Sequence, residues 1–269
     1  MCACERCWAL RTSDSATSNQ VHRCNGEVSP ERQPHAVLDL PSRRLKGLKI
    51  ERLLRLSERR PPLRMLEVGT GSGGIAHYFG THPELCCEVD AVDVIDNRLV
   101  TESYRYHEVV GTQLPFADET FDVVLSNHVI EHVGNQAAQT AHLVELHRVL
   151  RTDGVGYLAV PNRWMLVEPH FRLPFLSWLP KRLSNTYVRA AGKGTHYDCL
   201  PLTCARIEPM LSTAGFGWRQ HTGEALRLTY ELERPDARLY RWLLRHIPAH
   251  VFKPVRRVFP TLIYTLTRR

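Results

Sequence analysis

The stretch RMLEVGTGSGG (residues 64–74) decides the fold of this chain. It predicts a strand that runs into a glycine-rich turn and then into a helix. Glycine at positions 69, 71 and 73 lets the backbone turn tightly and lets a ligand touch the backbone, because no Cβ is in the way. The stretch also fits the pattern G-x-G-x-x-G, which is typical of dinucleotide binding. No Lys-Ser or Lys-Thr pair follows, which argues against a phosphate-binding loop of the nucleoside triphosphatases.

Strand and helix patterns alternate around this turn. Further strands are expected at residues 88–94, 106–110, 121–127 and 155–161, with late strands at 217–230 and 260–268. Helices are expected at residues 42–60, 136–150 and 203–216. Strand–helix alternation at this spacing predicts an α/β fold with a parallel sheet and helices on both faces.

The composition is that of one ordinary globular domain with additions. Of 269 residues, 43% are hydrophobic and 23% are charged, which excludes collagen-like, coiled-coil and wholly disordered classes. Residues 1–40 are polar and rich in Cys, and we expect a disordered leader there, followed by the domain at 41–269. Within the domain, residues 162–200 are aromatic, basic and broken by proline, which predicts an inserted lid, and 236–250 predicts a basic amphipathic helix.

No stretch predicts export or membrane insertion. The chain has no run of 18 apolar residues, and its start, MCACERCWAL, is too short and polar for a signal peptide. We therefore expect a cytoplasmic protein, which could also bind peripherally at the inner membrane surface.

Four of the eight cysteines fall in the first 24 residues, with Cys4 and Cys7 in a C-x2-C pair. Since no second pair follows, the sequence predicts no metal site.

The net charge of +7 is unevenly placed. Neither the tail after Asp236 nor the segment 169–197 contains an acidic residue, whereas the remainder is net negative. Nucleic acid, a membrane surface and an anionic substrate are all compatible with such segments. The tail lacks the interleaved aromatic pattern of a nucleic-acid groove. In the helix expected at 236–250, arginines lie on the face opposite Trp and Leu, which favours binding to an anionic membrane surface. The alternative is that the apolar face of this helix packs on the sheet.

A carboxylate at the end of the second strand narrows the choice of cofactor. Asp93 follows the glycine turn at the spacing of a residue that binds a ribose diol, with a helix N-cap as the alternative. Either a nicotinamide dinucleotide or S-adenosylmethionine fits these features.

One continuous block of motifs separates these two cofactors. Leu114-Pro115-Phe116, Phe121-Asp122-Val123-Val124 and Val129-Ile130-Glu131-His132-Val133 follow one another in order. With these motifs, the chain resembles the class I S-adenosylmethionine-dependent methyltransferases, of the methyltransferase type 11-like kind, over residues 64–161 and more loosely over 43–269. The resemblance implies a doubly wound, seven-stranded, mostly parallel Rossmann-like sheet with a terminal antiparallel hairpin. It says nothing specific about the substrate.

The resemblance also implies which residues hold S-adenosylmethionine. The glycine loop lies along the methionine moiety, Asp93 holds the ribose, and Glu67 supports the loop and the amino group of the cofactor. An Asp that usually contacts the adenine is missing before Leu114, so we expect Thr112, Gln113 or backbone groups there. The full set of cofactor residues is Glu67, Gly69, Thr70, Gly71, Gly73, Asp93, Val94, Thr112, Gln113, Asn127 and His128.

Methyl transfer from a sulfonium mainly requires that the acceptor is aligned with the methyl group. A hydroxyl or amine acceptor also needs a base whose pKa lies near neutrality, which favours histidine. His170 and His132 are the candidate catalytic residues, because both follow strands at the edge where open α/β sheets bind ligands. Candidate substrate contacts are Glu131, Glu168, Arg172 and Tyr197. The alternatives are that His132 is a structural turn residue and that polar lid residues hold one another.

We therefore expect a methyltransferase acting on a small-molecule or lipid-like acceptor. One alternative is an NAD(P)-dependent oxidoreductase, which shares the glycine turn and Asp93 but leaves the motifs at 114–124 unexplained. A second alternative is a non-catalytic cofactor-binding protein, against which the intact loop argues. The sequence does not determine the oligomeric state.

Overall fold

The computed structural model describes residues 39–238, 242, 246–252 and 254–269. The chain divides into two units, Met1–Gln33 and Pro34–Arg269, and the description that follows concerns the second. The predicted leader, with its cysteines, lies outside the described residues apart from its last two positions. Among the described helices, none is both long and apolar enough to span a bilayer.

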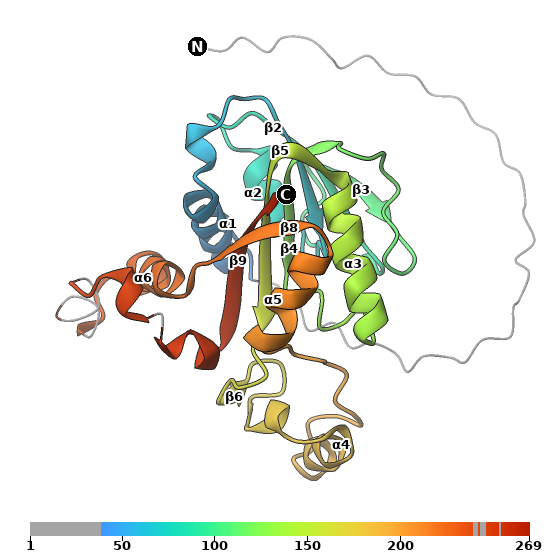
Figure 1. The fold of residues 1–269 in the computed structure, drawn as a ribbon, viewed down its shortest axis with the longest axis vertical. Helices are drawn as coiled ribbons and strands as arrows, with labels where there is room; N and C mark the ends of the chain where they lie inside the picture. Colours follow the sequence, from blue (N-terminus) through green and yellow to red (C-terminus); the bar gives the residue numbers. More distant parts are fainter. Residues whose placement is uncertain (1–38, 239–241, 243–245, 253) are drawn as a thin grey trace, which may run out of the picture. The chain divides into compact units, whose positions relative to one another are not determined.

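A seven-stranded sheet forms the centre of this unit, in the order β3-β2-β1-β4-β5-β9-β8 (Figure 1). The strands are β1 (Leu63–Val68), β2 (Cys87–Asp93), β3 (Arg105–Glu108), β4 (Phe121–Asn127), β5 (Leu150–Pro161), β8 (Phe216–Gln220) and β9 (Thr261–Arg268). The first five are parallel, whereas β9 runs antiparallel to both β5 and β8. The expected mostly parallel sheet with its terminal antiparallel hairpin is confirmed.

Helices cover both faces of the sheet, as doubly wound folds require. The flanking helices are α1 (Leu40–Leu54), α2 (Gly74–Gly80), α3 (Gln136–Val149), α5 (Cys204–Thr213) and α6 (Thr222–Glu233). One buried cluster joins α1, α2 and α6 to one sheet face, and a second joins α3 and α5 to the other. The central strands are therefore buried on both sides, which explains why their sequences are almost continuously apolar.

The late part of the chain differs from the prediction. The strand expected at 217–230 ends at Gln220 as β8, and residues 222–233 form α6 instead. Its sequence, TGEALRLTYELE, is rich in strong helix formers, and Ala225 packs into the cluster of α1 and α2. Helix propensity, combined with a sheet face on which the segment can pack, therefore outweighed the strand expected there. The helix expected at 236–250 falls partly on residues 239–241 and 243–245, which lie outside the described residues.

Residues 162–200, the lid segment, follow the carboxyl end of β5 (Figure 1). The segment contains the hairpin of β6 (Val167–Glu168) and β7 (Leu173–Pro174), a short 3-10 helix at Leu176–Trp178, and α4 (Lys181–Ala190). It has a small core of its own, made by Phe171, Leu173, Leu176, Val188, Tyr197 and Cys199. The lid segment is thus a packed element and not an irregular loop.

Candidate active site

The glycine loop follows β1 and lies against the turn that follows β4. Gly69 and Gly73 both have positive φ, at 80° and 79°. A Cβ on Gly69 would overlap the side chain of Val129, and one on Gly73 would overlap the backbone of Val100. Glycine is required at both positions, because the left-handed conformation and the close approach each exclude a side chain.

Asp93, at the end of β2, holds this loop in place. Its carboxylate accepts the backbone N–H groups of Gly71, at 2.9 Å, and of Val94, at 2.8 Å. Each oxygen retains a further lone pair, and the residue is only partly buried, so that ribose hydroxyls can still be accepted. The Thr70 hydroxyl is turned inward and donates to the Val92 carbonyl at 3.1 Å, which leaves the backbone of Thr70 as its contribution to the loop.

Glu67 lies in β1, two residues before Gly69, and its side chain is almost completely buried. Burial raises the pKa of Glu67 to about 8, although the Ala76 backbone N–H and the positive charge of Arg43 both oppose the rise. Its Oε2 atom is buried without a hydrogen-bond partner. A buried carboxyl oxygen with unused acceptor capacity suits a positively charged amino group such as that of S-adenosylmethionine.

The residues expected beside the adenine lie in the loop after β3. This loop leaves the sheet next to Asp93, since the Val109 N–H donates to the Asp93 carbonyl at 2.9 Å. Thr112 is partly exposed and Gln113 is exposed. Both side chains can therefore be reached by a ligand, and their contact with adenine stays a prediction.

The turn after β4 carries several of the predicted residues. Asn127 ends the strand, and its Oδ1 atom is buried without a hydrogen-bond partner. His128 has a φ of +60°, and its Nδ1 lies 3.4 Å from a carboxylate oxygen of Glu131. Burial alone would raise the pKa of Glu131, but His128 and His132 outweigh it and leave that pKa below its usual range. Glu131 therefore stays ionised in the interior.

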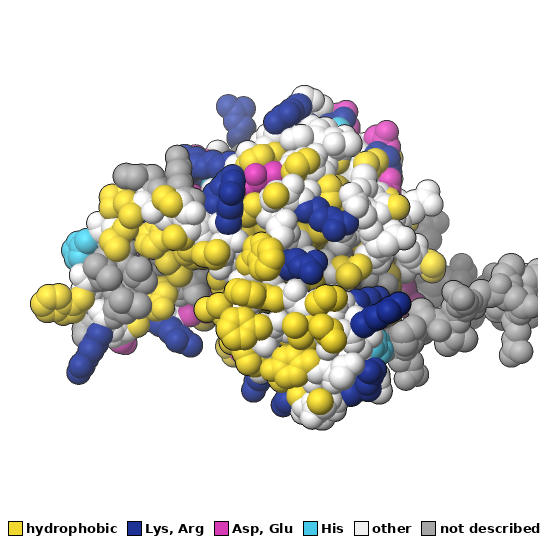
Figure 2. Space-filling model, turned by 60° about the horizontal axis from the view of Figure 1, so that its bottom comes forward, with side chains coloured by type: hydrophobic (Ala, Val, Ile, Leu, Met, Phe, Trp, Pro, Cys, Tyr) yellow, Lys and Arg dark blue, Asp and Glu magenta, His cyan; other side chains and the backbone are white. Residues whose placement is uncertain are grey.

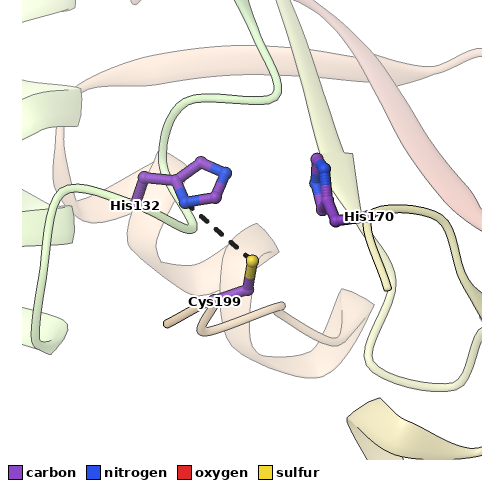
Figure 3. Close-up of side chains that lie close together, drawn as sticks. All are labelled: His132, His170 and Cys199. Carbon is purple, nitrogen blue, oxygen red and sulfur yellow. Dashed lines mark hydrogen bonds between the residues drawn. The ribbon is translucent and has the colours of Figure 1, made fainter. Parts of the chain in front are cut away.

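His132 and His170 come together although they lie in different elements (Figure 3). Their ring centroids are 5.6 Å apart. A buried carboxylate lies near each ring, with Glu131 at 3.8 Å from His132 Nε2 and Glu168 at 4.0 Å from His170 Nε2. Glu168 is also held by the backbone N–H of Phe171, at 2.7 Å. The two predicted catalytic histidines and two of the predicted substrate residues thus form one group.

Sequence reasoning missed one member of this group. Cys199 Sγ lies 3.9 Å from His132 Nδ1, to which it is hydrogen-bonded (Figure 3). Burial, followed by the charges of Asp198, Glu168 and Glu131, raises the pKa of the Cys199 thiol well above its usual range. No local pattern marks this cysteine, since it stands 67 residues from His132 in the chain.

The other two predicted substrate residues lie in different surroundings. Tyr197 is buried in the core of the lid segment, with its ring 5.7 Å from that of Phe171, and its hydroxyl is buried without a hydrogen-bond partner. Arg172 has a φ of +55° and is exposed. Burial, followed by the charges of Cys199, Glu168 and Glu131, raises the pKa of Tyr197, which indicates that Tyr197 lies near the histidine group. Arg172, in contrast, faces solvent.

Comparison with known proteins bears on the central part of the chain. A family model described as a methyltransferase domain matches residues 66–158. The uncharacterized methyltransferase YcgJ of Bacillus subtilis is 28% identical over 109 residues, which cover 38% of this chain and 42% of YcgJ. The ubiquinone biosynthesis O-methyltransferase of Parvibaculum lavamentivorans is 27% identical over 173 residues, which cover 60% of this chain and 61% of that enzyme.

The chain therefore spans less than two thirds of the length of these curated relatives. The crystal structure of YcgJ superposes with a TM-score of 0.46 at 16% identity, covering 82% of this chain and 99% of that one. The family match, the ordered motifs and the strand order agree on the cofactor, which is S-adenosylmethionine. The chain carries a class I S-adenosylmethionine-dependent methyltransferase domain, which the family model matches over residues 66–158.

Proposed function

We propose that this protein transfers a methyl group from S-adenosylmethionine to a small-molecule or lipid-like acceptor that binds between the turn after β4 and the lid segment. One observation carries the proposal. The turn touches the glycine loop through Val129, which covers Gly69, and three residues later it faces the lid segment through His132, which meets His170. The cofactor loop and the polar residues of the lid segment are thus joined by one short turn.

When bound, S-adenosylmethionine supplies an electrophilic methyl group whose leaving group is part of the cofactor itself. The residues of this chain then have to bind and orient the cofactor and the acceptor, and they have to exclude water. Glu67 would hold the amino group and Asp93 the ribose, while Gly69 and Gly73 allow close approach of the backbone. Asn127 and His128 would line the space beyond the glycine loop.

His132 and His170 would contact the reacting atom of the acceptor. Imidazole groups are suited to this position, because they can accept a proton or bind a heteroatom near neutral pH. The carboxylates of Glu131 and Glu168, which lie near the two rings, orient them and favour this role. Tyr197, with its unused hydroxyl, is the further group that we expect to meet the acceptor.

Calorimetric titration with S-adenosylmethionine and, separately, with NADH tests the choice of cofactor. We expect binding of S-adenosylmethionine alone, and binding of NADH alone would favour the oxidoreductase. Incubation of the protein with a metabolite extract and S-adenosylmethionine labelled in the methyl group should yield a labelled product. A protein that binds the cofactor but yields no product would support the non-catalytic alternative.

The variant His170→Ala tests the role of the histidine group in the same assay. We expect loss of the labelled product with nearly unchanged affinity for S-adenosylmethionine, because His170 belongs to the lid segment and not to the glycine loop. His196→Ala is the matched control, since this histidine also lies in the lid segment but pairs with Thr195. Full activity of His170→Ala, or lost cofactor binding, would contradict the role.

We also propose that the protein approaches this acceptor from an anionic membrane surface. The lid segment exposes seven large apolar side chains. Leu200 is one of them, and we call the other six the apolar face, namely Trp164, Leu166, Val167, Phe175, Trp178 and Leu183. Figure 2 shows hydrophobic side chains gathered at this end of the molecule with Lys and Arg side chains around them. Lys181 and Arg182 are exposed beside it, and residues 169–197 include no acid. Exposed aromatic rings rimmed by basic groups are typical of proteins that bind at the membrane interface.

A further inference from the structure

We propose that His132, His170 and Cys199 bind one zinc ion, at a site where the sequence predicted none. Imidazole nitrogen and thiolate sulfur are the ligands that zinc prefers in proteins. Each of the three residues offers one such atom, and these atoms all lie within 4.8 Å of one another. Within the described ranges of the chain, no other group of this kind is found.

The spacing is close to that of a tetrahedral site. Zn–N bonds of roughly 2.0 Å and Zn–S bonds of roughly 2.3 Å place two ligand atoms about 3.3–3.6 Å apart. Cys199 Sγ and His132 Nδ1 are already 3.9 Å apart. All three ligand atoms lie within 4.8 Å of one another, so the group would have to contract by about 1 Å around the ion.

The surroundings of the three residues match those of zinc ligands. Metal-bound histidines usually turn their second nitrogen toward a carboxylate, which fixes the ring and makes it a better ligand. His132 directs Nδ1 toward Cys199, while its Nε2 faces Glu131 at 3.8 Å. Glu168 stands in the corresponding place beside His170. Both carboxylate side chains are at most 1% exposed, and a cation at the centre of the group would balance their charge.

Three separate segments hold the ligands in position. The Leu200 N–H donates to the Glu131 carbonyl at 2.9 Å, and the Gln139 side chain donates to the carbonyls of Ile130 and Leu200. These bonds fasten the residues around Cys199 to the turn that carries His132. His170 is held by the hairpin of β6 and β7. Metal sites need such support, because ligands left to loops without second contacts lose their geometry.

Three protein ligands leave one tetrahedral position open, as in catalytic zinc sites. Resting on the function proposed above, we infer that this position takes the heteroatom of the acceptor, a hydroxyl or a thiol. Zinc lowers the pKa of a bound hydroxyl or thiol, so the acceptor would lose its proton to solvent near neutral pH without a histidine acting as the base. Its oxygen or sulfur would then bond to the methyl carbon, while the bond between that carbon and the sulfonium sulfur breaks and its electron pair stays on the sulfur of the cofactor. His132 and His170 would then act on the acceptor through the metal, as neutral ligands, in place of the direct contact described under the proposed function.

Cobalt(II) in place of zinc tests the site in the full chain. The four cysteines of residues 1–38 are first replaced by serine, so that only Cys86, Cys87, Cys199 and Cys204 remain. We expect one bound Co(II) per chain, with the intense visible bands of a tetrahedral ion and a near-ultraviolet band from sulfur to cobalt. Zinc should displace the cobalt, and elemental analysis should find about one zinc per chain after dialysis.

Variants then assign the ligands. Cys199→Ala should lose the sulfur-to-cobalt band and bind metal at least tenfold more weakly. Cys204→Ala is the matched control, because this cysteine is equally buried but lies in α5, outside the group, and it should leave the spectrum unchanged. Glu131→Gln removes no ligand, and we expect it to weaken metal binding by roughly 10- to 100-fold.

Several results would overturn the proposal: no tetrahedral spectrum, an unchanged sulfur band in Cys199→Ala, or metal binding that disappears with the N-terminal cysteines. Circular dichroism of each variant checks that it is folded. None of these measurements uses S-adenosylmethionine or turnover, so a missing metal site and a failed methyltransferase assay remain distinguishable.

Discussion

At the scale of single residues, Gly69 lets the glycine loop pack directly against the turn after β4. Its positive φ lets β1 end in a tight turn, and the missing side chain lets Val129 lie directly on the loop. The same residue thereby serves the backbone conformation and the packing of two segments that are distant in the chain.

We expect Gly69→Ala to lower the affinity for S-adenosylmethionine at least tenfold. The new methyl group would overlap Val129 and force the loop away from its bound conformation, at a cost of about 1–3 kcal/mol in the free energy of unfolding. Calorimetric titration and urea unfolding measure the two effects. Gly192→Ala is the control, since Gly192 also has a positive φ but has open space around it. Wild-type cofactor affinity in Gly69→Ala would contradict this account of the loop.

At the scale of elements, the lid segment depends on its connection to the last part of the chain. The side chain of Asn162 is fully buried where β5 ends. Its amide donates to the carbonyls of Arg257 and Phe259, at 2.8 and 2.7 Å, and its oxygen accepts the N–H of Trp164 at 3.1 Å. One side chain thus joins the start of the lid segment to the segment that leads into β9.

We expect Asn162→Ala to destabilise the protein by about 1–3 kcal/mol, because it leaves buried backbone groups without partners. The lid segment should also be cut faster by proteases, with cleavage confined to residues near 162–200 and 253–260. Urea unfolding and mass spectrometry of the proteolytic fragments measure these effects. The affinity for S-adenosylmethionine serves as the control and should change little. Uniform cleavage across the domain would contradict a local role for Asn162.

At the scale of the whole molecule, the positive charge and the catalytic fold are separate features. The chain carries +7 overall, yet the stretches without acidic residues are residues 169–197, within the lid segment, and the tail after Asp236. The residues that the cofactor is expected to touch, Glu67 and Asp93, are acidic. On the membrane proposal, this charge would act in the approach to an anionic surface and not in the binding of S-adenosylmethionine.

Flotation with lipid vesicles tests the membrane proposal. We expect binding to vesicles that contain phosphatidylserine at low salt, and weaker binding to phosphatidylcholine alone, since each basic side chain near an anionic surface contributes about 1 kcal/mol. The double variant Trp164→Ser/Trp178→Ser should lose this binding. Trp242→Ser is the matched comparison, because Trp242 lies in the tail and is 86% exposed. Absence of wild-type binding at low salt would contradict the proposal, and an effect of Trp242→Ser alone would move the contact to the tail.

The sequence by itself determined the sheet, the glycine loop and the cofactor. Each depends on local patterns: apolar strands, glycine spacing and an acidic strand end, all within residues 64–161. The late strand predicted at 217–230 was wrong beyond Gln220, because the local sequence does not tell whether a sheet edge or a sheet face is available to the segment. Helix α6 took the open face beside α1.

Only the tertiary structure decided which side chains gather around His132. The sequence placed His132 and His170 after two parallel strands, β4 and β5, which end at the same edge of the sheet. It could not pair them with each other or with Cys199, because these contacts join three segments whose spacing in the chain carries no period. The lid segment had to fold back on its own small core before Cys199 met the histidines. Local patterns therefore determined the sheet and the glycine loop, and long-range packing determined the group of His132, His170 and Cys199.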